Sequence, residues 1–154
     1  MWVTVWRHGE AAPGAIDEHR PLTARGRQSL RAVVRGFVER CEQAGVPLPD
    51  AMAFSPLVRT TQTAEILALG LGLCPRSCAA LAPSAERPAP QAFLDESRAH
   101  EVIVSHQPFV SELINDWLDS RDLPPLMPGG YACIDLLAAA RGGGTLAFSE
   151  ANIL

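Results

Sequence analysis

The chain has 154 residues, enough for one domain with a hydrophobic core and too few for two ordinary ones, so we expect a single domain over residues 1–154. Hydrophobic residues make up 47% of the sequence and charged residues 19%, which excludes an intrinsically disordered chain. The net charge of −4 argues against a nucleic-acid partner, which would need a basic surface, and no apolar run is long enough to predict a membrane partner.

The first residues and the cysteines together predict a compartment. Charge begins at Arg7, so the chain does not open with the basic and then apolar pattern of a secretory signal. The four cysteines are scattered, and the nearest two, Cys74 and Cys78, have neither a second pair nor a nearby histidine to complete a zinc site. We therefore expect reduced cysteines, no bound metal and a cytoplasmic location.

Strand and helix patterns alternate in the first half of the sequence. Residues 1–6 are rich in Val and Trp, which is typical of a strand. In the segment 21–45, apolar residues repeat at the spacing of a helix face, and Thr23 is suited to cap the helix N-terminus. Residues 51–54 predict a short buried strand. A second helix is expected to begin with Ser55 as its N-cap, followed by a first-turn proline, and to end near residue 69.

The alternation continues in the second half. Residues 78–83 are expected to end a strand, and a shorter helix is expected after Pro90. The segment 101–105 carries no charge after its first residue and is the clearest strand pattern, leading into an amphipathic helix over 106–120. The last elements are two strands joined by a glycine-rich turn, at residues 131–139 and 145–153.

This order of elements predicts the fold class. Strands that alternate with helices form a mostly parallel sheet covered on both faces, so we expect a three-layer α/β/α sandwich with a hairpin at its C-terminal edge. Trp2 and Trp6 are expected in the core. His19 and His100 have no motif around them and are expected at the surface.

Basic side chains follow three of the predicted strands, where ligands bind in open α/β sheets. Arg7 and His8 follow the first strand, Arg59 lies one turn into the helix after the second, and His106 follows the strand 101–105. Helix N-termini add backbone N–H donors there. Two arginines and two histidines therefore predict an anion site, and phosphate suits the guanidinium fork better than a carboxylate does.

Three motifs carry a family resemblance. The segments "RHGE", "SPLVRTTQTAEIL" and "VSHQP" together resemble the histidine phosphatase superfamily, also called phosphoglycerate mutase-like. The short length and the segment "RPLTARG" resemble its SixA-type phosphohistidine phosphatases. The resemblance covers essentially the whole chain. It implies a single histidine phosphatase domain with the phosphoglycerate mutase-like fold and no cofactor.

The resemblance also implies roles for these residues. His8 would be the nucleophile that takes up the phosphoryl group, which requires a neutral imidazole. Arg7 and Arg59 would hold the phosphoryl oxygens, and His106 would donate a hydrogen bond to one of them. Arg20 is either a third phosphate-binding arginine or an anchor of its own loop.

The acid that protonates the leaving group is less clear. Many members of the family supply it from an insertion that this chain is too short to hold. Glu10 lies close to the nucleophile in sequence, Asp17 and Glu18 lie in the following loop, and Glu86 is nearest to the family position. A phosphohistidine substrate would lower the need for an acid, because one nitrogen–phosphorus bond replaces another.

These observations favour a phosphatase that acts on phosphohistidine in a protein, such as a phosphorelay domain. One alternative is a phosphatase of a small phosphorylated metabolite, which would need further basic groups for a second anion. Another is a phosphate-binding regulatory module without turnover. The complete set of two arginines and two histidines argues against that last alternative.

Overall fold

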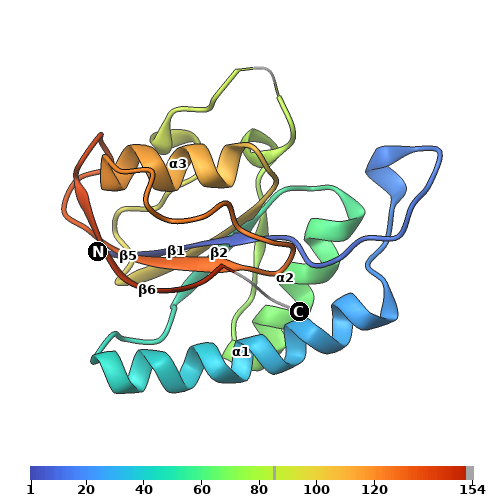
Figure 1. The fold of residues 1–154 in the computed structure, drawn as a ribbon, viewed down its shortest axis with the longest axis horizontal. Coiled ribbons are helices and arrows are strands. Elements are labelled where there is room, and N and C mark those ends of the chain that lie inside the picture. Colours follow the sequence, from blue (N-terminus) through green and yellow to red (C-terminus); the bar gives the residue numbers. More distant parts are fainter. Residues whose placement is uncertain (85, 152–154) are drawn as a thin grey trace.

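A six-stranded sheet runs through the described part of the chain, residues 1–84 and 86–151 of a computed structural model (Figure 1). Its order is β3-β2-β4-β1-β5-β6. The strands are β1 (Trp2–Arg7), β2 (Ala51–Phe54), β3 (Arg76–Ser77), β4 (His100–Ser105), β5 (Tyr131–Leu136) and β6 (Gly144–Glu150). Neighbours from β3 to β1 pair in parallel, whereas β5 pairs antiparallel with β1 and with β6. The predicted parallel sheet with a C-terminal hairpin at its edge is confirmed.

Helices cover both faces of the sheet. Figure 1 shows α1 (Ala24–Ala44) and α2 (Val58–Leu71) below the sheet and α3 (Phe109–Leu118) above it. Three short 3-10 turns complete the pattern, at η1 (Asp17–His19), η2 (Ala79–Leu81) and η3 (Pro90–Ala92). This arrangement confirms the predicted three-layer α/β/α sandwich. Among the described residues, no helix combines the length and apolar character needed to cross a membrane.

The first helix forms as its sequence predicts. The Thr23 hydroxyl accepts a hydrogen bond from the Gly26 backbone N–H at 2.9 Å, which satisfies one of the free donors of the first turn. Gly45 ends α1 in the left-handed conformation, with φ of 67°. Local capping signals therefore set both ends of α1.

Three predicted elements differ from the structure. The helix α2 begins at Val58 rather than at Ser55, because the Ser55 hydroxyl bonds to the His106 ring and not to the helix N-terminus. Residues 78–83 contain the turn η2 instead of a strand end. After Pro90 the chain makes only the single turn η3, which ends where Phe93 and Leu94 pack into the core. The end of the last predicted strand, residues 152–153, lies outside the described residues.

Two apolar layers fill the space between the sheet and its helices. Side chains of β1 alternate, so that Trp6 packs on the α1 side with Phe37 and Tyr131, and Val5 packs on the α3 side. All four cysteines are free thiols, as predicted. His100 is not at the surface as predicted: it is fully buried on the α1 side, because its ring nitrogens bond to Thr4 and to the Pro47 carbonyl.

Candidate active site

Three parallel strands end side by side and place the predicted residues together. In the order β2-β4-β1, Phe54 pairs with Val104 and Arg7 pairs with Ser105, so the next residue of each strand leaves the sheet at the same edge. Those residues are Ser55, His106 and His8. The ring centroids of His8 and His106 lie 5.4 Å apart. The edge is the one that parallel α/β sheets use for ligands.

His8 is held as a neutral imidazole. Its Nδ1 bonds to the Gly9 carbonyl oxygen at 2.7 Å, and since only an N–H can bond there, the lone pair lies on Nε2. The pKa of His8 is lowered from 6.5 to about 4, mainly by burial and in smaller part by the charges of Arg59 and Arg7, against an opposing effect of the Gly9 carbonyl. At neutral pH the ring is therefore uncharged.

The turn after His8 is fixed by a side chain that the sequence did not single out. The Thr63 hydroxyl on α2 accepts a hydrogen bond from the Gly9 N–H at 3.0 Å and donates one to the Arg59 carbonyl at 2.8 Å. A Cβ atom at Gly9 would lie 2.7 Å from a methyl carbon of Leu30, so any larger residue here would displace this buried side chain. Thr63 is the last residue of the segment "RTTQT" in the helix motif, so the motif already contained this side chain.

The two arginines approach from different elements. Arg59 is buried on α2, and its Nη1 and Nη2 donate to the Asp17 carbonyl at 2.8 Å and to the Asp17 carboxylate at 3.1 Å. Arg7 leaves the end of β1, and its Nη1 donates to the Leu126 carbonyl at 2.9 Å. Gln107 donates to that same carbonyl at 3.2 Å. Burial, followed by the charge of Arg59, lowers the pKa of Arg7, which still stays charged at neutral pH.

His106 lies beside His8 with one ring nitrogen occupied. Its Nε2 is 2.6 Å from the Ser55 hydroxyl oxygen, whereas its Nδ1 is buried without a hydrogen-bond partner among the described residues. The pKa of His106 is lowered to about 3, mainly by burial and in smaller part by the neighbouring His8 and Arg59. This ring is therefore also neutral at physiological pH.

Unpartnered nitrogen atoms gather at this edge of the sheet. In residues 1–84 and 86–151, four buried side-chain polar atoms lack a partner, and three of them are Arg7 Nε, Arg59 Nε and His106 Nδ1. Such atoms are costly inside a protein, because burial removes water and nothing replaces it. An anion with several oxygen acceptors would satisfy all three. The arrangement is therefore suited to bind an anion.

The predicted acids and Arg20 lie around this site in different ways. Asp17 bonds to Arg59 and to Arg20, and these hydrogen bonds lower the pKa of Asp17. Arg20 also donates from Nε to the Ala12 carbonyl at 2.8 Å, so it anchors its loop. The Glu10 carboxylate accepts from the Thr23 hydroxyl at 2.9 Å, at the start of α1. Glu86 lines a cavity of about 290 Å³ together with His106.

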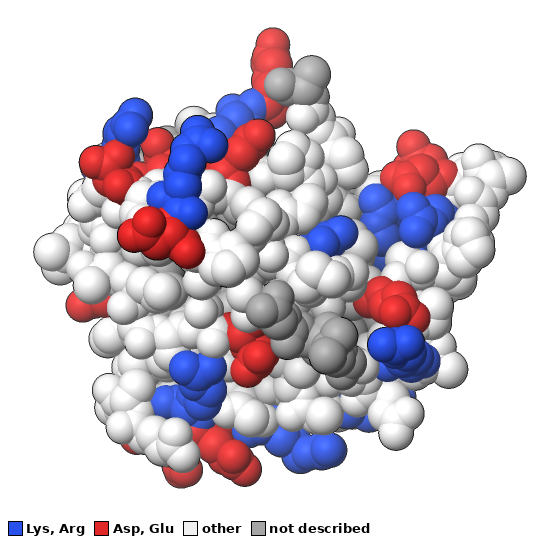
Figure 2. Space-filling model, viewed as in Figure 1, with Lys and Arg blue, Asp and Glu red and all other residues white. Residues whose placement is uncertain are grey.

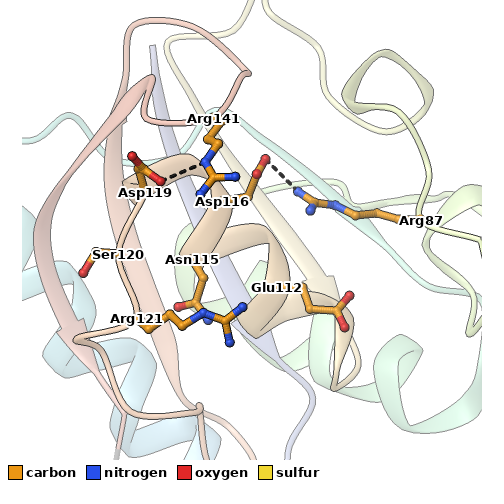
Figure 3. A pocket seen from close by; sticks show the side chains of 8 residues that line it. All are labelled: Arg87, Glu112, Asn115, Asp116, Asp119, Ser120, Arg121 and Arg141. Atoms are coloured by element: carbon orange, nitrogen blue, oxygen red, sulfur yellow. Dashed lines mark hydrogen bonds and ion pairs between the residues drawn. The ribbon is translucent and has the colours of Figure 1, made fainter.

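Several charged side chains elsewhere among the described residues are paired with each other. On the described part of the face in Figure 2, acidic and basic side chains lie against one another. A larger hollow of about 510 Å³ near the end of α3 contains the ion pairs Arg87–Asp116 and Arg141–Asp119, both 3.1 Å or shorter (Figure 3). In this hollow Asp116 and Asp119 already pair with two of the arginines. At the edge that holds His8, the buried Nε atoms of Arg7 and Arg59 have no partner among the described residues, so that edge is the stronger candidate for an anion site. Among the described residues, no set of three or more His, Cys, Asp or Glu side chains could hold a metal ion.

Comparison with known proteins identifies the family. The model of the histidine phosphatase superfamily (branch 1) matches residues 3–82. An uncharacterized protein of Picosynechococcus sp. is 37% identical over 120 residues, which cover 73% of this chain and 70% of that protein. The chain belongs to the histidine phosphatase superfamily. The family predicted from the three motifs is confirmed, and with it the enzyme class of histidine phosphatase.

The fold of this histidine phosphatase is similar to solved structures that match it over nearly the whole of both chains. It matches the protein histidine phosphatase SixA complexed with tungstate at a TM-score of 0.79 and 26% identity, covering 98% of this chain and 97% of that one. It also matches phosphoserine phosphatase from Entamoeba histolytica in complex with 3-phosphoglyceric acid, at a TM-score of 0.67 and 15% identity, over 98% and 97% of the chains. The second likeness shows the shared fold, and the predicted phosphoglycerate mutase-like fold is confirmed.

Proposed function

We propose that this histidine phosphatase hydrolyses a phosphoryl group through a phosphohistidine formed on His8, and that its substrate is phosphohistidine in a protein. One observation carries the proposal. A neutral imidazole with its lone pair on Nε2 lies within a group of three buried, unpartnered nitrogens of Arg7, Arg59 and His106. A nucleophile and anion-binding donors are the two requirements of phosphoryl transfer to a side chain.

The reaction has two displacements. His8 Nε2 attacks phosphorus, a new nitrogen–phosphorus bond forms, and the bond from phosphorus to the leaving nitrogen breaks. The leaving nitrogen keeps the electron pair of that bond, and with a proton on its other ring nitrogen the substrate histidine departs as a neutral imidazole. A water oxygen then attacks the same phosphorus, the bond to His8 breaks, and inorganic phosphate leaves with the remaining water proton going to solvent. Throughout, the hydrogen bond from Nδ1 to the Gly9 carbonyl keeps Nε2 aimed outward and stabilises the charge that the ring acquires on phosphorylation.

The arginines and His106 stabilise the transferring group. Phosphoryl transfer asks the protein mainly to position the group and to neutralise its charge. Arg7 and Arg59 supply two guanidinium groups, and His106 supplies a ring N–H without adding a positive charge, since its pKa is about 3. Donors that are already in place cost no reorganisation as charge builds on the oxygens.

Two of the candidate acids are engaged by other side chains, which is compatible with a substrate that needs little acid. Asp17 bonds to two arginines and Glu10 to Thr23, whereas Glu86 lines the cavity beside His106. An imidazole leaving group needs little assistance, because a nitrogen–phosphorus bond is exchanged for one of the same kind. The likeness to the protein histidine phosphatase SixA, at 26% identity over nearly the whole chain, supports the same substrate.

A phosphatase of small metabolites is the second candidate. The cavity beside His106 also contains Glu86 and Arg87, a carboxylate and a guanidinium that could bind the remainder of a small phosphorylated molecule. The shared fold with a phosphoserine phosphatase is compatible with this reading. A non-catalytic phosphate-binding module is the third, and it predicts binding of phosphate without a phosphoenzyme.

One experiment separates these candidates. The wild type and His8→Ala are incubated without metal with a histidine-phosphorylated protein domain, with phosphoserine and with a generic alkyl phosphate. We expect an acid-labile phosphoenzyme in the wild type alone and faster turnover of the phosphorylated domain. Faster turnover of the small esters would support the metabolite reading. Phosphate binding with no phosphoenzyme from any substrate would leave only the binding module.

A further inference from the structure

Ser55 contacts the site through His106. Its hydroxyl oxygen lies 2.6 Å from His106 Nε2, and the residue is 0% exposed. Its backbone is held on both sides: its N–H donates to the Val104 carbonyl at 3.0 Å, and its carbonyl accepts from the Thr60 hydroxyl at 2.6 Å. The serine hydroxyl therefore occupies a fixed position beneath the ring.

The short Ser55–His106 contact is compatible with two tautomers of the ring. If Nε2 carries the proton, it donates to the Ser55 oxygen, the serine O–H has no recorded acceptor among the described residues, and a lone pair on buried Nδ1 faces the anion site. If Nδ1 carries the proton, the serine O–H donates to Nε2 and Nδ1–H is free to donate. With an anion bound, only the second arrangement gives every polar group a partner.

We propose that Ser55 is a positioning residue that fixes His106 in the tautomer protonated on Nδ1, so that Nδ1–H is the donor to the phosphoryl oxygen. This inference rests on the proposed function, since it names the atom through which His106 acts. No proton transfer is required: the serine O–H stays on serine, and Nδ1–H stays on the ring. Ser55, which follows β2, thus orients His106, which follows β4. It does not cap the helix α2.

Ring-nitrogen NMR tests the tautomer without any substrate. Long-range proton–nitrogen correlation spectra of the 15N-labelled enzyme distinguish a protonated ring nitrogen from one with a lone pair, with His106 assigned by comparison with His106→Asn. We expect Nδ1–H in the wild type, and a measurable share of Nε2–H in Ser55→Ala. The matched control is Ser105→Ala, which removes another buried serine hydroxyl, one that donates to the Leu81 carbonyl at 2.9 Å. It is expected to keep the wild-type tautomer.

Kinetics on a histidine-phosphorylated domain test the consequence. We expect kcat of Ser55→Ala to fall by about ten- to a hundredfold with little change in KM, the range seen when the partner that orients a metal-bound imidazole is removed. Ser55→Cys retains a weak donor in nearly the same volume and is expected to recover part of the loss. Thermal unfolding of each variant shows whether it is folded at the assay temperature.

Two amides at position 106 provide an independent test. An Asn side chain can place its NH₂ near the position of Nδ1, and a Gln side chain can place its NH₂ near Nε2. We expect His106→Asn to keep more activity than His106→Gln. The reverse order, or Nε2–H in the wild-type spectrum, or a Ser55→Ala enzyme with unchanged tautomer and kcat, would overturn the inference. A wild type that forms no phosphoenzyme would instead remove the proposed function, while the spectrum would still report the tautomer.

Discussion

The two ends of β4 carry two buried histidines in contrasting surroundings. His100, at the start of the strand, is 0% exposed and has both ring nitrogens bonded, Nδ1 to the Pro47 carbonyl at 2.7 Å and Nε2 to Thr4 at 2.8 Å. His106, just past the other end, is 4% exposed and has a partner for Nε2 only. Burial lowers the pKa of both. Burial alone therefore does not set the two histidines apart, whereas the unpartnered ring nitrogen of His106 does.

The largest expected difference is between the effects of replacing His8 and of replacing His100. We expect His8→Ala to lose turnover by about 10⁴-fold or more, since a covalent route without its nucleophile is closed. His100→Ala should keep the wild-type kcat but unfold more easily, by about 2–4 kcal/mol, because a buried cavity forms and two polar groups lose their partner. Phosphoenzyme trapping and urea unfolding measure the two effects. Loss of the phosphoenzyme in a folded His100→Ala enzyme would contradict this division.

A second contrast compares arginines at the site and away from it. We expect Arg59→Lys to lower kcat/KM by about a hundredfold, because lysine keeps the charge but lacks the planar fork and its Nε donor. The control is Arg76→Lys: Arg76 pairs at 2.8 Å with the buried carboxylate of Glu101, which lies near the start of β4 rather than at the end that leads to His106. It should lose stability and not turnover. Equal losses of kcat/KM in both variants would show that the fork at Arg59 has no special part in the reaction.

The buried histidines should also make stability depend on pH. The pKa of folded His8, about 4, lies below the ordinary 6.5, so the unfolded chain binds the proton first as pH falls. The stabilisation is complete above about pH 6.5 and decreases progressively toward about pH 4. We expect the loss of unfolding free energy between pH 7 and pH 5 to be smaller in His8→Gln than in the wild type, by about 1–2 kcal/mol. If the free energy of unfolding, measured with urea, fell equally with pH in the wild type and in His8→Gln, the prediction would be wrong.

The smallest expected effect concerns the carboxylate that occupies Arg59. Asp17 competes with an incoming anion for Nη2 of this arginine, although its exposed position weakens the pair. We expect Asp17→Asn to bind tungstate or phosphate about two- to fivefold more tightly, as measured by calorimetry. The control is Glu18→Gln, which removes one negative charge from the same turn without breaking a bond to Arg59. It shows how much of the change in affinity comes from net charge alone. No difference between the two variants would show that Asp17 does not compete.

Much of the fold followed from local patterns. Apolar periodicity and caps set α1, and the strongly apolar segments set β1, β2 and β4, whose parallel pairing places His8 and His106 at one edge. Contacts between distant residues were harder to foresee. Arg59 and Asp17 are 42 positions apart, and Ser55 and His106 are 51 apart, so no window of sequence contains both partners.

Single residues without a repeating pattern were also unpredictable from the sequence. His100 has no motif around it, and its burial depends on Thr4 and Pro47, which reach it only through tertiary packing. Ser55 followed by proline has the signature of a helix start, yet its hydroxyl bonds to the histidine instead. A local preference is a weak guide where a buried polar partner competes for the same hydroxyl.

The main-chain carbonyl oxygen of Leu126 accepts hydrogen bonds from both Arg7 and Gln107. A point mutation exchanges side chains and leaves the peptide carbonyl in place, so no single codon change at this position deletes the acceptor. The anchor of this guanidinium therefore depends on the path of the loop between α3 and β5 and not on which side chain position 126 carries.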